Sequence, residues 1–329
     1  MKTILISLLI VFSCFAETYP QQRMADEDVI KVDTSLVVVP TKVTDRNNKN
    51  ITNLKRENFR LFEDGVEQKI ENFEDADVPF TIALALDVSD STAAKLTKIK
   101  VAAIAFLAEL RKNDRVLIFT FDNRLAKVAD GTVADLSNIQ NSIAFSQTGG
   151  GTSLYDATTT IITDYLAKIG GKKALILFTD GIDTQSVYQT SASSARLAEE
   201  SDVLIYPIQY ETVGDVLKPK TADLPFGASV QIVTVKGEPL PAAFKRGTLY
   251  LNSLANGTSG QFFYADTPEN LSKSFARIAK ELSQLYGLSY YPQNETANGK
   301  RRQIKVTVDV PKAIVRPRRS YIFNRSNSK

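Results

Sequence analysis

The sequence predicts an α/β fold: a doubly wound, mostly parallel sheet, inserted into or flanked by a small β-sandwich-like module. From residue 79 onward, short apolar runs alternate with segments whose apolar residues have helical spacing, the pattern of parallel strands covered by helices on both faces. Segments with β-strand patterns come before and after this alternation. The 329 residues, 43% of them hydrophobic, suffice for one large core and a smaller domain.

The first residues, MKTILISLLIVFSCFA, predict a signal peptide over 1–16. A basic residue precedes an apolar run over 4–12 that is too short for a membrane span, and polar sequence follows at once. Cleavage after Ala16 would leave a chain without cysteine. Cleavage before Cys14 would leave a lipid-anchored cysteine; VFSC resembles a bacterial lipobox, from which Phe12 departs. Both routes predict export to the periplasm, the cell surface or the medium, with membrane contact only through a lipid at Cys14.

An N-terminal β segment is expected over 30–77. Residues 35–44 (SLVVVPTKVT) are rich in β-branched side chains, which favour a strand. The stretch FRLFEDGVEQKIENF contains two short strand patterns around Asp64-Gly65, a hairpin signal. This segment is therefore predicted to form a small antiparallel unit.

The α/β domain is expected over 79–285. Its buried strands are predicted over 80–87, 114–122, 172–180 and 203–210, and its helices over 93–113, 133–145, 152–170 and 193–202. Residues 249–266 predict a further helix and strand, and Thr267 caps a closing amphipathic helix over 267–287. Residues 211–247, which contain four prolines, predict an irregular insertion, with one hairpin around ASVQIVTVKG.

The C-terminal segment, 286–323, again has strand patterns, in LSYYP, RRQIKVTVDV and RRSYIF. We expect these strands to pair with those of the N-terminal segment. The segment is basic, and its cationic side chains are interpreted as solvated charges that discourage edge pairing. They are Arg301, Arg302, Lys305, Arg316, Arg318 and Arg319.

Short oxygen-bearing side chains gather at the predicted strand ends. Asp87, Ser89 and Ser91 follow the first buried strand in DVSDS, and Thr152 lies in the glycine-rich stretch TGGGTSLYDA. Asp180 ends the strand KALILFT, with Asp183 close behind it. In open parallel sheets ligands bind outside the carboxyl ends of the strands, so we expect these clusters to meet. For one cluster alone, helix capping would explain such residues equally well.

Together, these three pieces resemble the von Willebrand factor type A (VWA) domain and its metal-ion-dependent adhesion site. The resemblance covers roughly residues 79–285. It implies a VWA fold and a site for Mg²⁺ (or Mn²⁺ or Ca²⁺), to which a protein ligand would add an acidic residue. The implied metal ligands are Asp87, Ser89, Ser91, Thr152 and Asp180.

Two further carboxylates are candidates for the rim of this site. Asp90 and Asp183 would lie beside the ligands rather than on the metal, and both are equally well interpreted as solvated loop residues. Asp156, four residues after Thr152, is interpreted as a structural residue of the helix. The two flanking β segments resemble those of a family of exported bacterial proteins built around such a domain.

Composition argues against an enzyme. The chain has no histidine and one cysteine, Cys14, so a Ser-His-Asp triad and a zinc site built on cysteine or histidine are absent from the predicted mature chain. GGGTS lacks the Gly-Lys-Ser/Thr ending of a phosphate loop. A net charge of +3 is too small to indicate nucleic-acid binding. The sequence therefore predicts an exported, cation-dependent protein-binding module. A structural envelope scaffold without a functional metal is the alternative, and a metal-dependent hydrolase a minor one.

Overall fold

The computed structural model describes residues 36–93, 95–210, 233–294, 296 and 299–323. The predicted signal peptide, including Cys14, and residues 211–232 of the predicted insertion lie outside the described residues. Among the residues that are described, no helix is long and apolar enough to cross a membrane.

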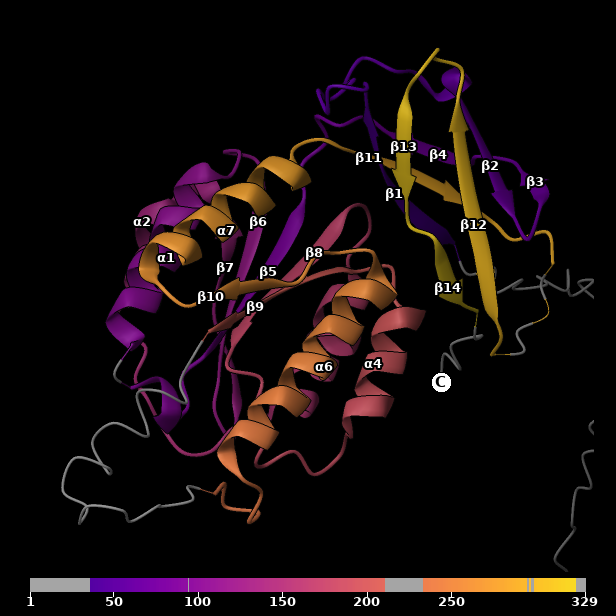
Figure 1. Ribbon diagram of the computed structural model, residues 1–329. Coiled ribbons are helices and arrows are strands. Elements are labelled where there is room, and N and C mark those ends of the chain that lie inside the picture. Colours follow the sequence, from indigo (N-terminus) through magenta and orange to yellow (C-terminus); the bar gives the residue numbers. More distant parts are fainter. Residues whose placement is uncertain (1–35, 94, 211–232, 295, 297–298, 324–329) are drawn as a thin grey trace, which may run out of the picture. The chain divides into compact units, whose positions relative to one another are not determined.

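The centre of the fold is a six-stranded sheet with the order β10-β9-β8-β5-β6-β7 (Figure 1). All neighbouring strands are parallel except β6 and β7, which confirms the predicted mostly parallel sheet. The strands are β5 (Thr81–Asp87), β6 (Arg115–Phe121), β7 (Leu125–Thr132), β8 (Lys173–Thr179), β9 (Leu204–Tyr210) and β10 (Phe263–Ala265).

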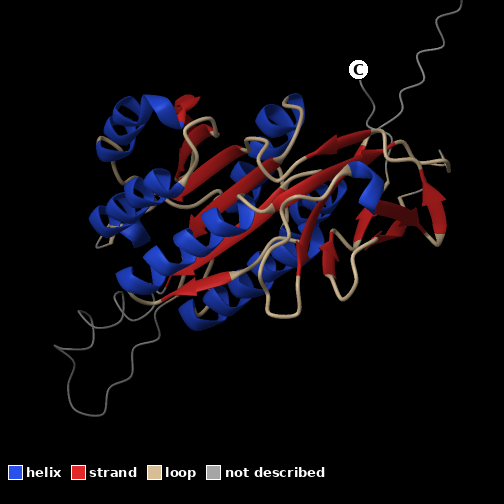
Figure 2. Ribbon diagram, turned by 90° about the horizontal axis from the view of Figure 1, so that it is seen from above, coloured by secondary structure: helices blue, strands red, loops and turns tan. Residues whose placement is uncertain are grey.

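Helices cover both faces of this sheet (Figure 2). One face packs against α1 (Leu96–Glu109), α2 (Leu136–Ala144) and α7 (Pro268–Leu282). The other packs against α3 (Leu154–Thr160), α4 (Ser191–Glu200) and α6 (Leu240–Thr258). Short helical segments complete the chain: η1 (Arg56–Asn58), η2 (Asp90–Thr92), η3 (Val133–Asp135), η4 (Ile161–Tyr165) and η5 (Leu166–Lys168).

Strand β5 shows why the apolar run is continuous. Its even-numbered residues Ile82, Leu84 and Leu86 belong to the core under α1, α2 and α7, whereas Ala83 and Ala85 belong to the core under α3, α4 and α6. Side chains alternate between the faces of a strand, so a strand that is covered on both faces must be apolar at every position. The run ends at Asp87, where the strand reaches the edge of the covering helices.

The start of α6 corrects one prediction. The prolines of 211–247 predict that residues 240–247 belong to the irregular insertion, but the helix begins at Leu240. Pro241 lies in the first turn, where the backbone N–H has no partner within the helix and proline is tolerated. Val233 and Pro239 form an isolated antiparallel bridge. The expected hairpin around ASVQIVTVKG lies partly outside the described residues.

The flanking segments form two four-stranded antiparallel sheets, ordered β13-β1-β11-β4 and β14-β12-β2-β3. Each sheet combines strands from both ends of the chain, which confirms the expected pairing. The N-terminal strands are β1 (Val37–Thr44), β2 (Phe59–Glu63), β3 (Val66–Gln68) and β4 (Asn72–Glu74). The C-terminal strands are β11 (Leu285–Tyr290), β12 (Arg301–Val308), β13 (Ile314–Pro317) and β14 (Ser320–Ile322).

The turn between β2 and β3 is the predicted hairpin. Asp64 and Gly65 both have positive φ angles, 47° and 86°, the geometry that Asp-Gly favours in a two-residue hairpin turn. This turn brings the end of β2, and with it Glu63, into a fixed register with β12.

Buried charges in the β module overturn part of the interpretation of the basic tail. Arg302 is 3% exposed, and its guanidinium donates to the carboxylate of Glu63 over 2.7 Å. The hydroxyls of Tyr290 and Tyr321 donate to the other oxygen of the same carboxylate. Because burying a charge is costly without partners, this cluster replaces the solvation that Arg302 and Glu63 lose.

Two further cations join the β module to the α/β elements. Arg318 is also buried, and it donates to the carbonyl oxygens of Glu199 and Ser201 at the end of α4, both over 2.6 Å. Lys172, just before β8, donates to the carbonyl oxygens of Asp75 and Leu285. Burial lowers the pKa of Lys172 to about 8. Arg302 and Arg318 are therefore structural residues rather than solvated edge charges.

Candidate metal centre

Asp87 ends β5 at the carboxyl edge of the parallel sheet and is fully buried. Its Oδ1 accepts hydrogen bonds from the Ser89 backbone N–H, over 3.0 Å, and the Ser89 hydroxyl, over 2.5 Å. Its Oδ2 accepts from the hydroxyl of Thr179, at the end of the neighbouring strand β8, over 2.6 Å. The Asp-x-Ser spacing thus lets Ser89 donate two hydrogen bonds to one oxygen of Asp87, while Thr179 of β8 donates to the other oxygen.

Ser91 joins the two predicted halves of the site. Its hydroxyl donates to Oδ2 of Asp180 over 2.8 Å, and its oxygen lies 3.3 Å from that of Ser89. The other oxygen of Asp180 accepts from the backbone N–H of Ile182 over 2.9 Å. One chain of contacts therefore runs from Asp87 through Ser89 and Ser91 to Asp180, residues that lie far apart in the sequence.

The glycine-rich loop that contains Thr152 is hydrogen-bonded to the Asp-x-Ser-x-Ser segment. The Gly149 N–H donates to the Val88 carbonyl and the Asp90 N–H to the Gly150 carbonyl, both over 3.0 Å. Gly150 has a φ of +61°, which a residue with a side chain rarely adopts. Thr152 is 4% exposed, and its carbonyl accepts from the backbone N–H of Thr184 over 2.9 Å. The Thr152 backbone N–H donates to the Thr184 hydroxyl over 2.9 Å.

The electrostatics of the site favour a cation. Burial and the nearby carboxylate of Asp180 raise the pKa of Asp87 to about 7, against an ordinary value of 3.8. A cation placed between two buried carboxylates that repel each other would relieve this repulsion. Among the described residues, no group of three or more His, Cys, Asp or Glu side chains could hold a metal, so any metal here would need the hydroxyls as well. Carboxylate and hydroxyl oxygens are the ligands that Mg²⁺ and Ca²⁺ prefer, so this donor set fits such an ion.

The remaining candidate carboxylates differ in their exposure and contacts. Asp90 is exposed and begins η2. Asp183 is 3% exposed and accepts from the Ser186 hydroxyl, while Lys236 approaches its other oxygen to 3.4 Å. No contact joins Asp90 or Asp183 to the other candidate ligands through their carboxylates within the described residues, so both remain rim candidates. Asp156 accepts from the backbone N–H groups of 187–189 and holds that loop, which confirms its structural role.

Sequence reasoning missed three residues that position Asp180. Thr179 accepts from the Gly181 N–H over 3.0 Å in addition to binding Asp87. Gln209, buried in β9, donates to the Asp180 carbonyl over 2.7 Å. Gly247 of α6 contacts the backbone of Gly181 so closely that a Cβ at 247 would lie 2.4 Å from the Gly181 oxygen. The threonine before the Asp-Gly pair was visible in the sequence, whereas the long-range contacts of Gln209 and Gly247 gave no local signal.

Comparison with protein families matches residues 82–182 to the von Willebrand factor type A domain. The match spans β5 to β8, and it includes all five candidate metal ligands. Comparison with the curated proteins finds no match.

Solved structures with a similar fold come from several sources. BatB from Bacteroides thetaiotaomicron is 18% identical, with a TM-score of 0.43, over 62% of this chain and 100% of that one. Proximal thread matrix protein 1 of the mussel byssus, with a zinc-occupied MIDAS motif, is 16% identical, with a TM-score of 0.46, over 66% and 48% of the two chains. The vWF domain of the pilus tip protein Mfa5 from Porphyromonas gingivalis is 14% identical, with a TM-score of 0.44, over 62% and 95%. The segment of this chain that matches the von Willebrand factor type A domain is therefore residues 82–182, from β5 to β8.

Proposed function

We propose that this chain is an exported protein-binding module that holds its ligand through a divalent cation. The observation that carries the proposal is the hydrogen bond from Ser91 to Asp180, because it links the Asp-x-Ser-x-Ser motif to the distant TDG segment at one edge of the sheet. A polar cap for η2 would account for Ser89 and Ser91, but it would not call for a second buried carboxylate.

Five residues would hold the cation: Asp87, Ser89, Ser91, Thr152 and Asp180. When bound, the cation would act as a Lewis acid that accepts a further oxygen ligand. The hydroxyls are neutral and only two carboxylates are present, so the protein's own ligands do not exceed the charge of a divalent ion. An acidic side chain of a partner protein could therefore complete the coordination of the cation as a further oxygen ligand. The chain's own residues keep the two carboxylates in place through Thr179, Gln209 and the Gly181–Gly247 contact.

The same donor set supports binding rather than catalysis. No histidine is present in the chain to act as a general base, and the two buried carboxylates already accept hydrogen bonds from Ser89, Thr179 and Ser91. Export is proposed from the sequence pattern of residues 1–16, and a lipid at Cys14 is the alternative that would attach the chain to a membrane. The proposed cation is Mg²⁺, for which Mn²⁺ or Ca²⁺ could substitute.

Partner capture tests the binding function. The immobilised wild-type chain should retain a protein from cell-envelope extracts in Mg²⁺ and release it in EDTA. Asp87→Asn should not retain that protein, whereas Asp164→Asn, which changes an exposed carboxylate that is not a candidate ligand, should retain it. Partners that are retained equally by Asp87→Asn and resist EDTA would contradict the proposal and favour a metal-free scaffold. Mass spectrometry of the eluates measures both outcomes.

A further inference from the structure

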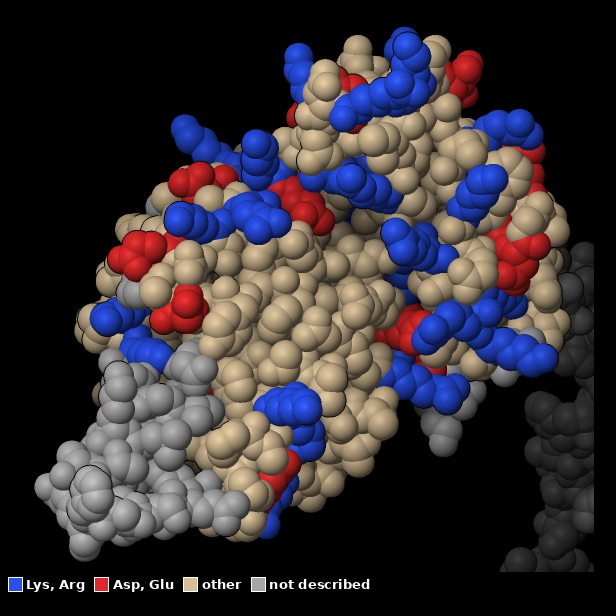
Figure 3. Space-filling view, viewed as in Figure 1, with Lys and Arg blue, Asp and Glu red and all other residues tan. Residues whose placement is uncertain are grey.

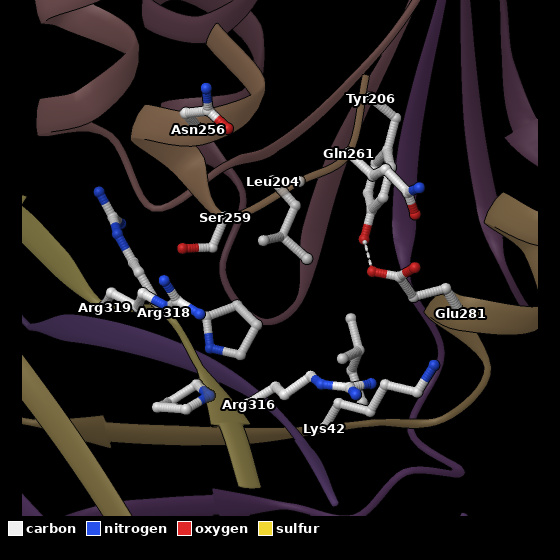
Figure 4. A pocket seen from close by; sticks show the side chains of 14 residues that line it. Lys42, Leu204, Tyr206, Asn256, Ser259, Gln261, Glu281, Arg316, Arg318 and Arg319 are labelled. Carbon is white, nitrogen blue, oxygen red and sulfur yellow. Dashed lines mark hydrogen bonds between the residues drawn. The ribbon is translucent and has the colours of Figure 1, made fainter. Parts of the chain in front are cut away.

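A cavity of about 420 Å³ lies at the opposite end of the parallel sheet from Asp87 (Figure 4). Its lining includes Leu204, the first residue of β9, and Ser259, which follows α6. It also includes Pro40 of β1 and Pro317 of β13. We call this space the basic cavity. It is separate from the candidate metal centre, because the starts and the carboxyl ends of parallel strands lie at opposite edges of a sheet.

The walls of the basic cavity carry four cations and one carboxylate. Figure 3 shows Lys and Arg side chains gathered around β13 and the segment that follows it. The carboxylate, Glu281, accepts a hydrogen bond from the Tyr206 hydroxyl over 3.1 Å. Of the cations, Arg318 is already bound to backbone carbonyl groups. The cationic wall residues are Lys42, Arg316, Arg318 and Arg319.

Lys42 and Arg316 lie directly opposite each other in the antiparallel register of β1 and β13. Like charges at such a position repel, since cross-strand side chains lie about 5 Å apart at Cβ. Within the described residues, no ion pair involves Lys42, Arg316 or Arg319, and Arg316 donates only to the Asn48 side chain, over 3.3 Å. The fold therefore holds two cations side by side at the wall of the cavity, and neither forms an ion pair with another described residue.

We propose that the basic cavity binds a small organic or inorganic anion through Arg316 and Lys42. A carboxylate or phosphate group offers oxygen atoms to both side chains, and the planar guanidinium of Arg316 can bind two oxygens at once. The volume lies in the range of small-molecule sites. Asn256 and Gln261 add polar groups to the wall. Glu281 lies across the cavity from Arg319 (Figure 4).

Calorimetric titration of the metal-free chain with succinate and with inorganic phosphate, at constant ionic strength, tests this inference. The two arms separate a carboxylate from a phosphate preference. The wild-type chain should bind at least one of these probes saturably at millimolar concentration or below. Arg316→Gln should weaken that binding by about tenfold or more, the range expected for losing a hydrogen bond to a charged group. Lys42→Gln, a second variant at the same wall, should weaken it too.

Lys305→Gln is the matched control, because Lys305 is an exposed cation on β12 that does not line the cavity. It should leave probe binding unchanged. Equal weakening in Lys305→Gln would indicate a general effect of net charge and would overturn the inference. Absence of saturable binding by the folded wild-type chain, with either probe, would overturn it as well. Both outcomes are independent of the metal centre, because the titration is done without metal.

Discussion

Asp87→Asn is expected to abolish the rise in thermal midpoint that Mg²⁺ or Mn²⁺ gives to the wild-type chain. A ligand that binds only the folded state stabilises it by about 2.7 kcal/mol at a concentration a hundred times its dissociation constant. For a domain of this size that corresponds to a rise of about 5 °C or more. The asparagine keeps the shape of Asp87 but removes one of two carboxylates from the site. Differential scanning calorimetry with and without metal measures the difference.

The metal-free Asp87→Asn chain should be at least as stable as the metal-free wild type at neutral pH. Folding raises the pKa of the Asp87 carboxyl from 3.8 to about 7, so the free energy of unfolding falls as the pH rises from about 4 to 7. The amide of asparagine does not ionise, so the variant does not lose this stability. A metal-dependent rise in midpoint that persists in Asp87→Asn would show that the metal binds elsewhere. Asp164→Asn controls for the loss of one carboxylate and should keep the full rise.

Arg302→Met is expected to lower the free energy of unfolding by about 3–5 kcal/mol, because it leaves the buried carboxylate of Glu63 without its counterion. Arg302 and Glu63 are each 4% exposed at the side chain and lie 2.7 Å apart. The tyrosines at 290 and 321 would still donate to Glu63, but they carry no charge. Chemical denaturation followed by circular dichroism measures the loss.

Two companion variants make that result specific. Arg60→Met removes an exposed ion pair with Glu67 on the same β2–β3 hairpin, where the side chains are 63% and 49% exposed. It should change the free energy of unfolding by less than about 1 kcal/mol. The double variant Glu63→Gln, Arg302→Met removes both charges and should recover part of the loss. If Arg302→Met cost no more than Arg60→Met, the buried pair would not contribute as described.

The sequence predicted the α/β layers because a strand covered on both faces is apolar along its covered length, as β5 is from Ile82 to Leu86 and β8 from Ala174 to Phe178. It did not predict β7 or β13. Residues 125–132 form an edge strand of the sheet in which no residue is buried, so they carry no continuous apolar run. The start of α6 was missed for another reason, since Pro241 was interpreted as a helix breaker although it lies in the first helical turn.

The candidate site, too, was predicted from the sequence only in part. Asp87, Ser89, Ser91 and Asp180 were predicted to meet because the carboxyl ends of neighbouring parallel strands share one edge, and hydrogen bonds now join them. The supports of Asp180 could not be predicted, because Gln209 and Gly247 act from elements whose packing no local pattern encodes. The buried roles of Arg302 and Arg318 were likewise hidden, since a basic strand at the end of a chain has the same pattern whether solvated or buried. The domain boundaries and the metal-ligand roles stay predictions.

Direct binding of Mn²⁺ to the metal-free wild-type chain tests the central claim, that Asp87, Ser89, Ser91, Thr152 and Asp180 together hold one divalent cation. Isothermal titration calorimetry gives the stoichiometry and the affinity in the same measurement. The account predicts saturable binding of one ion per chain, which Ser91→Ala weakens and Asp87→Asn abolishes. A folded wild-type chain that binds no Mn²⁺ at millimolar concentration, or that binds it equally well as Asp87→Asn, would contradict the account.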